Sequence, residues 1–187
     1  MQTEIILSGF GGQGIMFAGQ LLAYAAMDSG LEVTWMPSYG PEMRGGTANC
    51  TVIIAEEEIG SPTVLNPKAA LVFNLPSMIK YEPLVVSGGV FIINSSLMDR
   101  ETTRNEIKIL NIPANEIAES ISSTRLANMV MLGALIAKLP VIPIEGLEKA
   151  LDDHIPDRHR HLLDSNFQAL REGSLFEELK LVEDTVN

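Results

Sequence analysis

Apolar runs of strand length alternate with helix-like periodicity along most of the chain. This pattern predicts strands at residues 4–8, 32–36, 47–55, 70–74, 90–94 and 107–112. It predicts helices at residues 12–29, 77–81, 115–120, 124–138, 144–153 and 158–172. Gly9 ends the first strand, Gly30 ends the first helix, and Pro37 ends the second strand. Alternation of this kind is typical of an α/β fold.

The loop between the second and third predicted strands, residues 37–46, contains no helix, so these two strands can pair antiparallel. We therefore expect an α/β fold of three layers. Its open sheet is mainly parallel, and is mixed if those two strands pair antiparallel, with helices on both faces and a helical C-terminal part. The 187 residues suit one domain, which we assign to residues 1–175, followed by a C-terminal tail at 176–187.

The predicted helix after Thr124 has no wide polar face, because only Asn128 and Gly133 interrupt the apolar run at residues 126–137. Such a helix must be covered on all sides. At about 1.5 Å per residue it is too short to span a membrane. It is therefore either central in this fold or packed against another chain.

The charge balance restricts the partners of this chain. There are 13 Lys+Arg against 24 Asp+Glu, a formal net charge of -11, which argues against nucleic acid because that affinity depends on basic residues at phosphates. No apolar stretch approaches the roughly 20 residues that span a bilayer, and the N-terminus has no basic segment before an apolar one. We expect a cytoplasmic protein with neither a nucleic-acid nor a membrane partner.

Residue types that carry metal or redox chemistry are scarce. Cys50 is the single cysteine, which excludes an internal disulfide and a zinc or iron–sulfur site built from paired thiolates of this chain. We expect Cys50 to be a buried apolar residue of its strand. Three histidines near the C-terminus lack the spacing of metal ligands, and we expect them to lie on a solvated helix face: His154, His159 and His161. We therefore predict no metal site and no catalytic residue.

The segment Gly9-Phe10-Gly11-Gly12-Gln13-Gly14 has the G-x-G-x-x-G spacing between a predicted strand and a predicted helix. Glycines there allow a sharp turn and leave helix N-terminal amides directed at an anion, as in dinucleotide sites. A nicotinamide site also needs an acidic residue at the end of the second strand, and residues 33–41 contain none. The alternative is a tight crossover in which the glycines serve packing alone.

Loops that leave the carboxyl ends of parallel strands meet at one edge of the sheet. We therefore expect the glycine turn at 9–14 to lie beside the loop at 37–46, with Asn74 and Asn94 nearby. Arg44 is the only Lys or Arg in residues 1–67, and its guanidinium can bind a phosphate or carboxylate at two points. The alternative is an ion pair between Arg44 and Glu42.

Three segments together resemble one known family: residues 9–14, residues 38–49 (Ser38-Tyr39-Gly40-Pro41-Glu42-Met43-Arg44-Gly45-Gly46-Thr47-Ala48-Asn49) and residues 127–134. They resemble the gamma subunit of 2-oxoacid:ferredoxin (acceptor) oxidoreductases, most like the 2-oxoglutarate type, over the chain to about residue 175. The binding residues that we propose from these segments are Gly9, Gly11, Gly12, Gln13, Gly14, Glu42, Arg44, Gly45, Gly46 and Asn49.

The resemblance implies a reaction in which a 2-oxoacid, coenzyme A and an oxidised acceptor give an acyl-CoA, carbon dioxide and reduced ferredoxin or flavodoxin. It places thiamine diphosphate and iron–sulfur clusters on alpha, beta and ferredoxin-like delta subunits, so this chain alone holds no cofactor and has no activity. We expect its glycine turn and Arg44 to face a phosphate of coenzyme A or a carboxylate of a partner chain.

Three alternatives stay open. The 2-oxoacid can instead be pyruvate, a branched-chain 2-oxoacid or indolepyruvate, because its pocket should lie mainly on alpha and beta. The chain can be a free nucleotide-binding oxidoreductase. It can also be a purely structural subunit that contacts no ligand.

Overall fold

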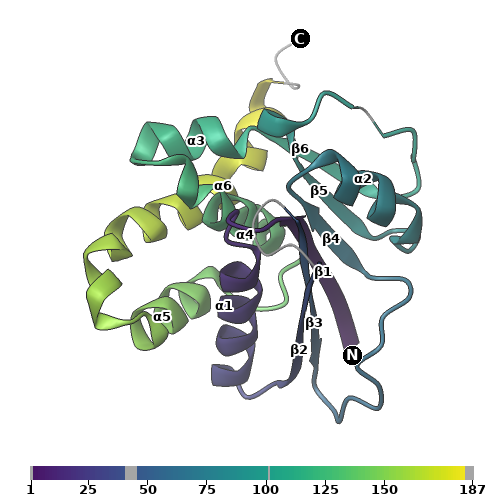
Figure 1. Ribbon diagram of the computed structural model, residues 1–187, viewed down its shortest axis with the longest axis horizontal. Helices are drawn as coiled ribbons and strands as arrows, with labels where there is room; N and C mark the ends of the chain where they lie inside the picture. Colours follow the sequence, from purple (N-terminus) through teal and green to yellow (C-terminus); the bar gives the residue numbers. More distant parts are fainter. Residues whose placement is uncertain (1, 41–45, 101, 184–187) are drawn as a thin grey trace.

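Six strands form one sheet in the order β2-β3-β1-β4-β5-β6 in the computed structural model, which describes residues 2–40, 46–100 and 102–183 (Figure 1). The strands are β1 (Gln2–Phe10), β2 (Glu32–Tyr39), β3 (Thr47–Ala55), β4 (Ala69–Val72), β5 (Val90–Asn94) and β6 (Lys108–Ile112). Strands β1, β4, β5 and β6 run parallel, whereas β3 lies between β1 and β2 and is antiparallel to both. The antiparallel pairing of the second and third strands is confirmed, and the sheet is mixed.

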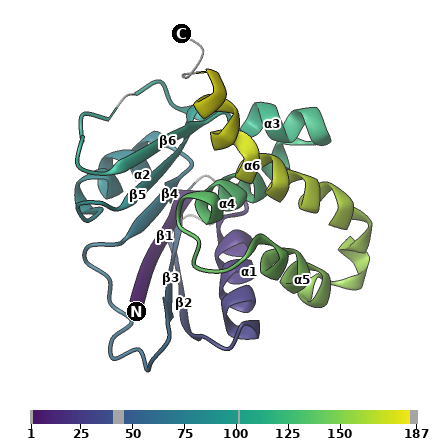
Figure 2. The ribbon, with the colours of Figure 1, turned by 180° about the vertical axis from the view of Figure 1, so that it is seen from behind.

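Helices cover both faces of this sheet. The α-helices are α1 (Ile15–Asp28), α2 (Leu75–Tyr81), α3 (Ala114–Ile121), α4 (Ala127–Lys138), α5 (Ile144–His154) and α6 (Leu163–Glu183). Short 3₁₀ helices are η1 (Glu82–Leu84), η2 (Ser95–Leu97), η3 (Thr124–Leu126) and η4 (Asp157–Leu162). Figures 1 and 2 show α1, α4 and α5 on one face and α2 on the other, so the expected three-layer architecture is confirmed.

Alternation along the strands separates two cores. Ile5 and Leu7 of β1 point to the larger core, beneath α1, α4, α5 and α6, whereas Ile6 points to the smaller core beneath α2. Residues of the inner strands β4 and β5 are buried on both faces, which is why these strands are continuously apolar in sequence.

Strand β2 does not end at Pro37, as the sequence pattern predicted, but continues to Tyr39. β2 is an edge strand that pairs only with β3. The Gly40 amide donates to the Thr47 carbonyl at 2.8 Å, and ladder bonds alternate along an antiparallel pair, so the nitrogen of Pro37 faces the open edge. A proline there costs no ladder hydrogen bond.

The helix predicted at 158–172 is divided in the structure. Residues 157–162 form η4, which has no buried residue, and α6 then begins at Leu163 and runs to Glu183. Because η4 buries nothing, the apolar periodicity that identifies a packed helix applies only from Leu163 onward. α6 continues past residue 175, after which we placed the tail at 176–187, and that division of the chain stays a prediction.

The apolar helix α4 lies at the centre of the fold. All of its residues from Ala127 to Ile136 are buried, so intramolecular burial is the correct one of the two alternatives. Gly133 of α4 lies against the backbone at Leu170, and Gly173 of α6 lies against the backbone at Val130, so two glycines bring these helices into close contact. Like every other helix in the described ranges, α4 lacks the length and apolarity of a membrane span.

Candidate functional site

The carboxyl ends of β1, β4, β5 and β6 meet at one edge of the sheet, which we call the carboxyl edge. After β1 the chain enters α1 on one face, and after β4 it enters α2 on the other. This divergence opens a crevice between the two strand ends, and in open α/β sheets ligands bind at such a position.

The glycine turn after β1 requires glycine for two reasons. Gly12 and Gly14 have φ angles of 101° and 75°, in the left-handed region that disfavours other residues. A Cβ atom on Gly9 would lie 2.5 Å from Gln13 Oε1 and 2.8 Å from Phe73 Cβ. The backbone conformation at Gly12 and Gly14 and the close packing at Gly9 thus both favour glycine in this motif.

Gln13 ties the turn to the neighbouring strand. Its Oε1 accepts from the Phe10 amide at 2.6 Å, and its Nε2 donates to the Phe73 carbonyl at 3.2 Å. Both polar ends of this side chain are therefore engaged within the chain. The Gln13 amide also donates to the Phe10 carbonyl at 3.2 Å, so it is not directed at a ligand.

The glycine turn and the end of the following loop lie side by side, as expected. The Gly11 amide donates to the Gly46 carbonyl at 3.0 Å, and Asn49 of β3 pairs with Ser8 of β1. Glu42, Arg44 and Gly45, which we also proposed from the sequence, lie outside the described residues.

A cavity of about 160 Å³ opens at the carboxyl edge beside the glycine turn. We call it the edge cavity, and its lining residues are Gly12, Gln13, Phe73, Asn94, Leu97, Asn115, Thr124, Arg125 and Ala127. Of the proposed binding residues it brings together Gly12 and Gln13. Asn94, expected nearby, also lines it, whereas Asn74 caps α2 by accepting from the Ser77 amide at 2.9 Å.

Two polar side chains of the edge cavity have unused hydrogen-bonding capacity. Asn94 is fully buried, and its Nδ2 donates to Asn115 Oδ1 at 2.9 Å, while its Oδ1 has no partner among the described residues. The exposed Arg125 forms no ion pair with any carboxylate in the described ranges. Sequence reasoning missed Arg125, because only the tertiary position of η3 brings this residue to the carboxyl edge.

The sheet order weakens the free nucleotide-binding alternative. A dinucleotide fold places the second strand beside the first, with its acidic residue at the shared edge. Here the antiparallel β3 occupies that place and presents Thr47 opposite Phe10. Strand β3 therefore places its amino end, which carries no carboxylate, beside the end of β1.

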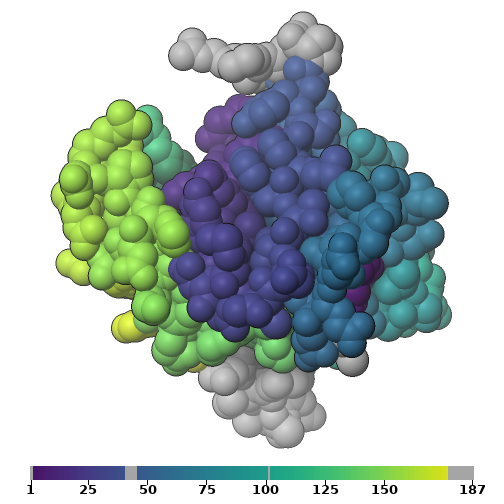
Figure 3. Space-filling view, turned by 90° about the horizontal axis from the view of Figure 1, so that it is seen from below, coloured from purple at the N-terminus to yellow at the C-terminus, as the bar shows by residue number. Residues whose placement is uncertain are grey.

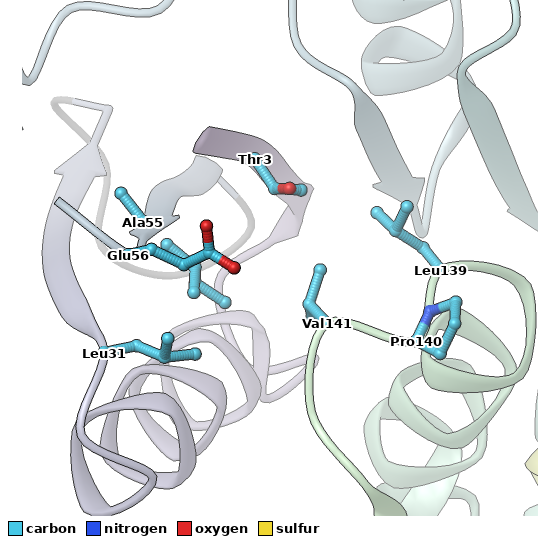
Figure 4. A pocket seen from close by; sticks show the side chains of 8 residues that line it. Thr3, Leu31, Ala55, Glu56, Leu139, Pro140 and Val141 are labelled. Atoms are coloured by element: carbon cyan, nitrogen blue, oxygen red, sulfur yellow. The ribbon is translucent and has the colours of Figure 1, made fainter. Parts of the chain in front are cut away.

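Other sites offer little chemistry. A hollow of about 270 Å³ at the opposite edge of the sheet is apolar apart from Thr3 and Glu56 (Figure 4). His154 Nε2 lies 3.1 Å from Asp28 Oδ2 and its ring stacks on Tyr24, which gives His154 a structural role.

The described residues contain no group of three His, Cys, Asp or Glu that could hold a metal ion. Cys50 is fully buried, as expected, and burial raises the pKa of its thiol to about 12.

Comparison with known proteins agrees with this architecture. The chain is 37% identical over 159 residues to the 2-oxoglutarate synthase subunit KorC of Methanocaldococcus jannaschii, a match that covers 83% of this chain and 85% of KorC. It is 37% identical over 148 residues to the ketoisovalerate oxidoreductase subunit VorA of Methanothermobacter marburgensis, covering 79% of this chain and 30% of VorA. The chain thus spans about a third of the length of the VorA relatives.

A solved structure has the same fold. It is the gamma subunit of a keto/oxoacid ferredoxin oxidoreductase from Geobacter sulfurreducens, with a TM-score of 0.78, 29% identity, and coverage of 92% of this chain and 96% of that one. The model of the pyruvate ferredoxin/flavodoxin oxidoreductase family matches residues 4–176. The chain therefore belongs to the pyruvate ferredoxin/flavodoxin oxidoreductase family.

Proposed function

We propose that this chain is the gamma subunit of a cytoplasmic 2-oxoacid:ferredoxin oxidoreductase. The complex would convert a 2-oxoacid, coenzyme A and oxidised ferredoxin or flavodoxin into an acyl-CoA, carbon dioxide and the reduced acceptor. The observation that carries this proposal is the family match over residues 4–176, in a chain whose fold resembles a gamma subunit over nearly its whole length.

The substrate that we propose is 2-oxoglutarate. The support is the match to KorC, which covers most of both chains, whereas the match to VorA covers only a third of that relative. Pyruvate and 2-oxoisovalerate are the competing substrates, since relatives named for both exist.

The donor set of this chain does not fit the cofactors of the reaction. Iron–sulfur clusters need several thiolates, whereas the only thiol, Cys50, is buried and keeps its proton because of its raised pKa. Magnesium, which commonly accompanies a diphosphate, prefers grouped oxygen ligands, and the described residues contain no such group. We therefore assign thiamine diphosphate and the clusters to alpha, beta and delta partners.

Our proposal for this chain's own contribution is contact with coenzyme A at the carboxyl edge. The support is the placement of the glycine turn beside Gly46, which brings residues 9–14 and the end of the Arg44 loop to one edge. Replacing Arg44 with alanine should then raise the apparent KM for coenzyme A or weaken assembly. Unchanged kinetics together with unchanged assembly would remove Arg44 from the proposal.

The decisive experiment is coexpression of the chain with the alpha, beta and delta subunits of a 2-oxoacid:ferredoxin oxidoreductase, followed by steady-state assays. We expect the purified complex to reduce ferredoxin with the highest kcat/KM for 2-oxoglutarate, against pyruvate and 2-oxoisovalerate. The isolated chain, assayed with the same substrates, should show no turnover. Turnover by the isolated chain, or failure to copurify with thiamine-dependent and iron–sulfur subunits, would contradict the proposal.

A further inference from the structure

Strand β2 leaves one edge of the sheet open. It is the outermost strand beside β3, has eight residues, and pairs with β3 alone. Natural sheets protect an edge by making the strand short or by adding lysine or proline. The other edge strand, β6, has five residues and begins with Lys108. β2 contains no lysine, none of its residues is buried, and Pro37 is its one protecting residue, so its open side is a template for another strand.

The main-chain groups of β2 point alternately toward β3 and toward the open edge. The Gly40 amide donates to a carbonyl of β3 at 2.8 Å, and the direction alternates from residue to residue, so the odd-numbered residues from 33 to 39 face outward. Pro37 offers a carbonyl but no amide. The open edge therefore presents four carbonyls and three amides, those of Val33, Trp35 and Tyr39.

A groove lies directly beside this open edge, between β2 and α1. Val33 and Trp35 of β2 point toward α1, since both pack against the core on that face of the sheet. With residues of α1 they line a hollow of about 280 Å³, which we call the α1–β2 groove. Figure 3 shows the helix and the strand next to each other at the surface of the molecule. The groove is lined by Gln20, Ala23, Tyr24, Met27, Val33 and Trp35.

A strand added to β2 would place half of its side chains in the α1–β2 groove. Residues directly opposite each other in paired strands point their side chains to the same face of the sheet. The residues opposite Val33 and Trp35 would therefore point toward α1. The polar groups of the lining are already engaged there, because Gln20 Nε2 donates to the Tyr24 hydroxyl at 2.9 Å, and Met27 is 53% exposed. The groove thus suits apolar side chains at every second position.

The end of β2 at Glu32 is acidic. Glu32 pairs with Ala55, the last residue of β3, and Glu57 and Glu58 lie in the turn that follows, all three carboxylates being on exposed residues. Residues 1–40, which include β1, α1 and β2, contain no lysine or arginine. A second copy of this chain would bring the same acidic surface to the edge. A basic segment complements it, because opposite charges across an interface favour association.

We infer that the open edge of β2 and the α1–β2 groove bind an extended segment of a larger subunit of the complex, as an added strand. The segment is apolar at alternate positions and carries a lysine or arginine at the end that lies beside Glu32. Main-chain hydrogen bonds to β2 supply affinity, and the groove selects the side chains. This inference rests on the proposed function, since the segment belongs to a partner subunit of that complex.

Amide exchange at single-residue resolution tests the added strand without any substitution. It is measured on the full chain alone and in the complex coexpressed with alpha, beta and delta subunits. We expect the amides of Val33, Trp35 and Tyr39 to exchange at least about tenfold more slowly in the complex. The even-numbered residues of β2 from 34 to 38 should change less, because their amides already bond to β3. Unchanged exchange at the three outward amides would overturn the inference.

Val33→Pro removes one outward amide and leaves the bonds between β2 and β3 in place. Val33→Ala is the matched control, because it also shortens the side chain but keeps the amide. We expect Val33→Pro to bind the purified larger subunits about tenfold more weakly than Val33→Ala, by calorimetry. Equal melting temperatures of the two variants check that the fold is intact. Equal affinities of the two variants would contradict strand addition.

Met27→Lys tests the groove, because it puts a positive charge where an apolar side chain of a basic segment would lie. We expect it to weaken binding by about tenfold or more. Leu65→Lys, at a residue that is 75% exposed and does not line the groove, should bind as the wild type does. Equal affinity of Met27→Lys and Leu65→Lys would overturn the inference.

Two further outcomes separate this inference from others. Dimerisation of the chain alone, with the same outward amides protected, would assign the edge to a second copy and overturn the inference. An active complex in which the β2 amides exchange as in the free chain would overturn the inference and leave the proposed function standing. Failure of the chain to bind any larger subunit would overturn both.

Discussion

Asn128 and Gly14, which are 114 positions apart, lie in direct contact: Asn128 Nδ2 donates to the Gly14 carbonyl at 3.2 Å. Asn128 Oδ1 in turn accepts from the Met129 amide at 3.0 Å. The one polar residue near the start of the buried helix α4 therefore holds the start of α1, and so positions the glycine turn. Two of the three segments that carry the family resemblance are joined by this contact.

We expect Gly14→Ala to destabilise the fold more than Gly30→Ala. Both glycines have positive φ angles, of 75° and 80°, so both substitutions cost about 1–2 kcal/mol of backbone strain. A Cβ on Gly14 would also collide with Asn128 Nδ2, whereas a Cβ on Gly30 would meet nothing within 4 Å. Urea unfolding of the two variants measures the difference, and equal losses would show that the Asn128 contact contributes nothing.

Gly133→Ala should separate the central helix pair. A Cβ on Gly133 would collide with the Leu170 carbonyl of α6, a backbone atom that cannot rotate away. We expect a loss of about 1–3 kcal/mol or more in the free energy of unfolding, as for other overpacked sites. Gly60→Ala is the control, because a Cβ there meets nothing within 4 Å. An unfolding midpoint as high in Gly133→Ala as in Gly60→Ala would contradict the close packing of α4 and α6.

Gln13→Ala should destabilise the glycine turn, because both polar ends of the Gln13 side chain are hydrogen-bonded within the chain. The variant loses the bonds from the Phe10 amide and to the Phe73 carbonyl, which together contribute about 1–3 kcal/mol. The exposed Gln168 of α6 offers a control substitution that should be nearly neutral. Urea unfolding gives the comparison, and a stability equal to that of Gln168→Ala would leave Gln13 free for another role.

Cys50 should make the stability of the chain depend on alkaline pH. Burial raises the pKa of its thiol from 9.0 to about 12, so between these values the unfolded chain loses a proton that the folded chain keeps. The contribution of Cys50 to the free energy of unfolding then falls as pH rises, by about 1.4 kcal/mol per pH unit. Urea unfolding at pH 8 and pH 10.5 should show a steeper loss in the wild type than in Cys50→Ala. Parallel losses in both proteins would show that the thiol ionises equally in the two states.

Most of the secondary structure followed from the sequence, because apolar period and glycine or proline punctuation act locally. The strands at 47–55 and 90–94 have the predicted bounds in the structure. The predicted end of β2 at Pro37 was wrong. A proline ends a strand only where its nitrogen faces a neighbouring strand, and the sequence does not show on which side of β2 that neighbour lies. The uniformly apolar helix α4 could not be assigned to the core or to an interface, because both environments favour the same residues.

The sequence by itself determined the fold class, the glycine turn, the scarcity of metal and redox ligands, and the resemblance to a gamma subunit. Each of these depends on residue types and their spacing along a short stretch of chain. Only the tertiary structure decided that β3 separates β1 from β2, that Asn128 holds Gly14, and that Asn94 and Arg125 share a cavity with the glycine turn. These relationships join residues far apart in the chain, and local periodicity carries no information about which segments meet at one edge of a sheet.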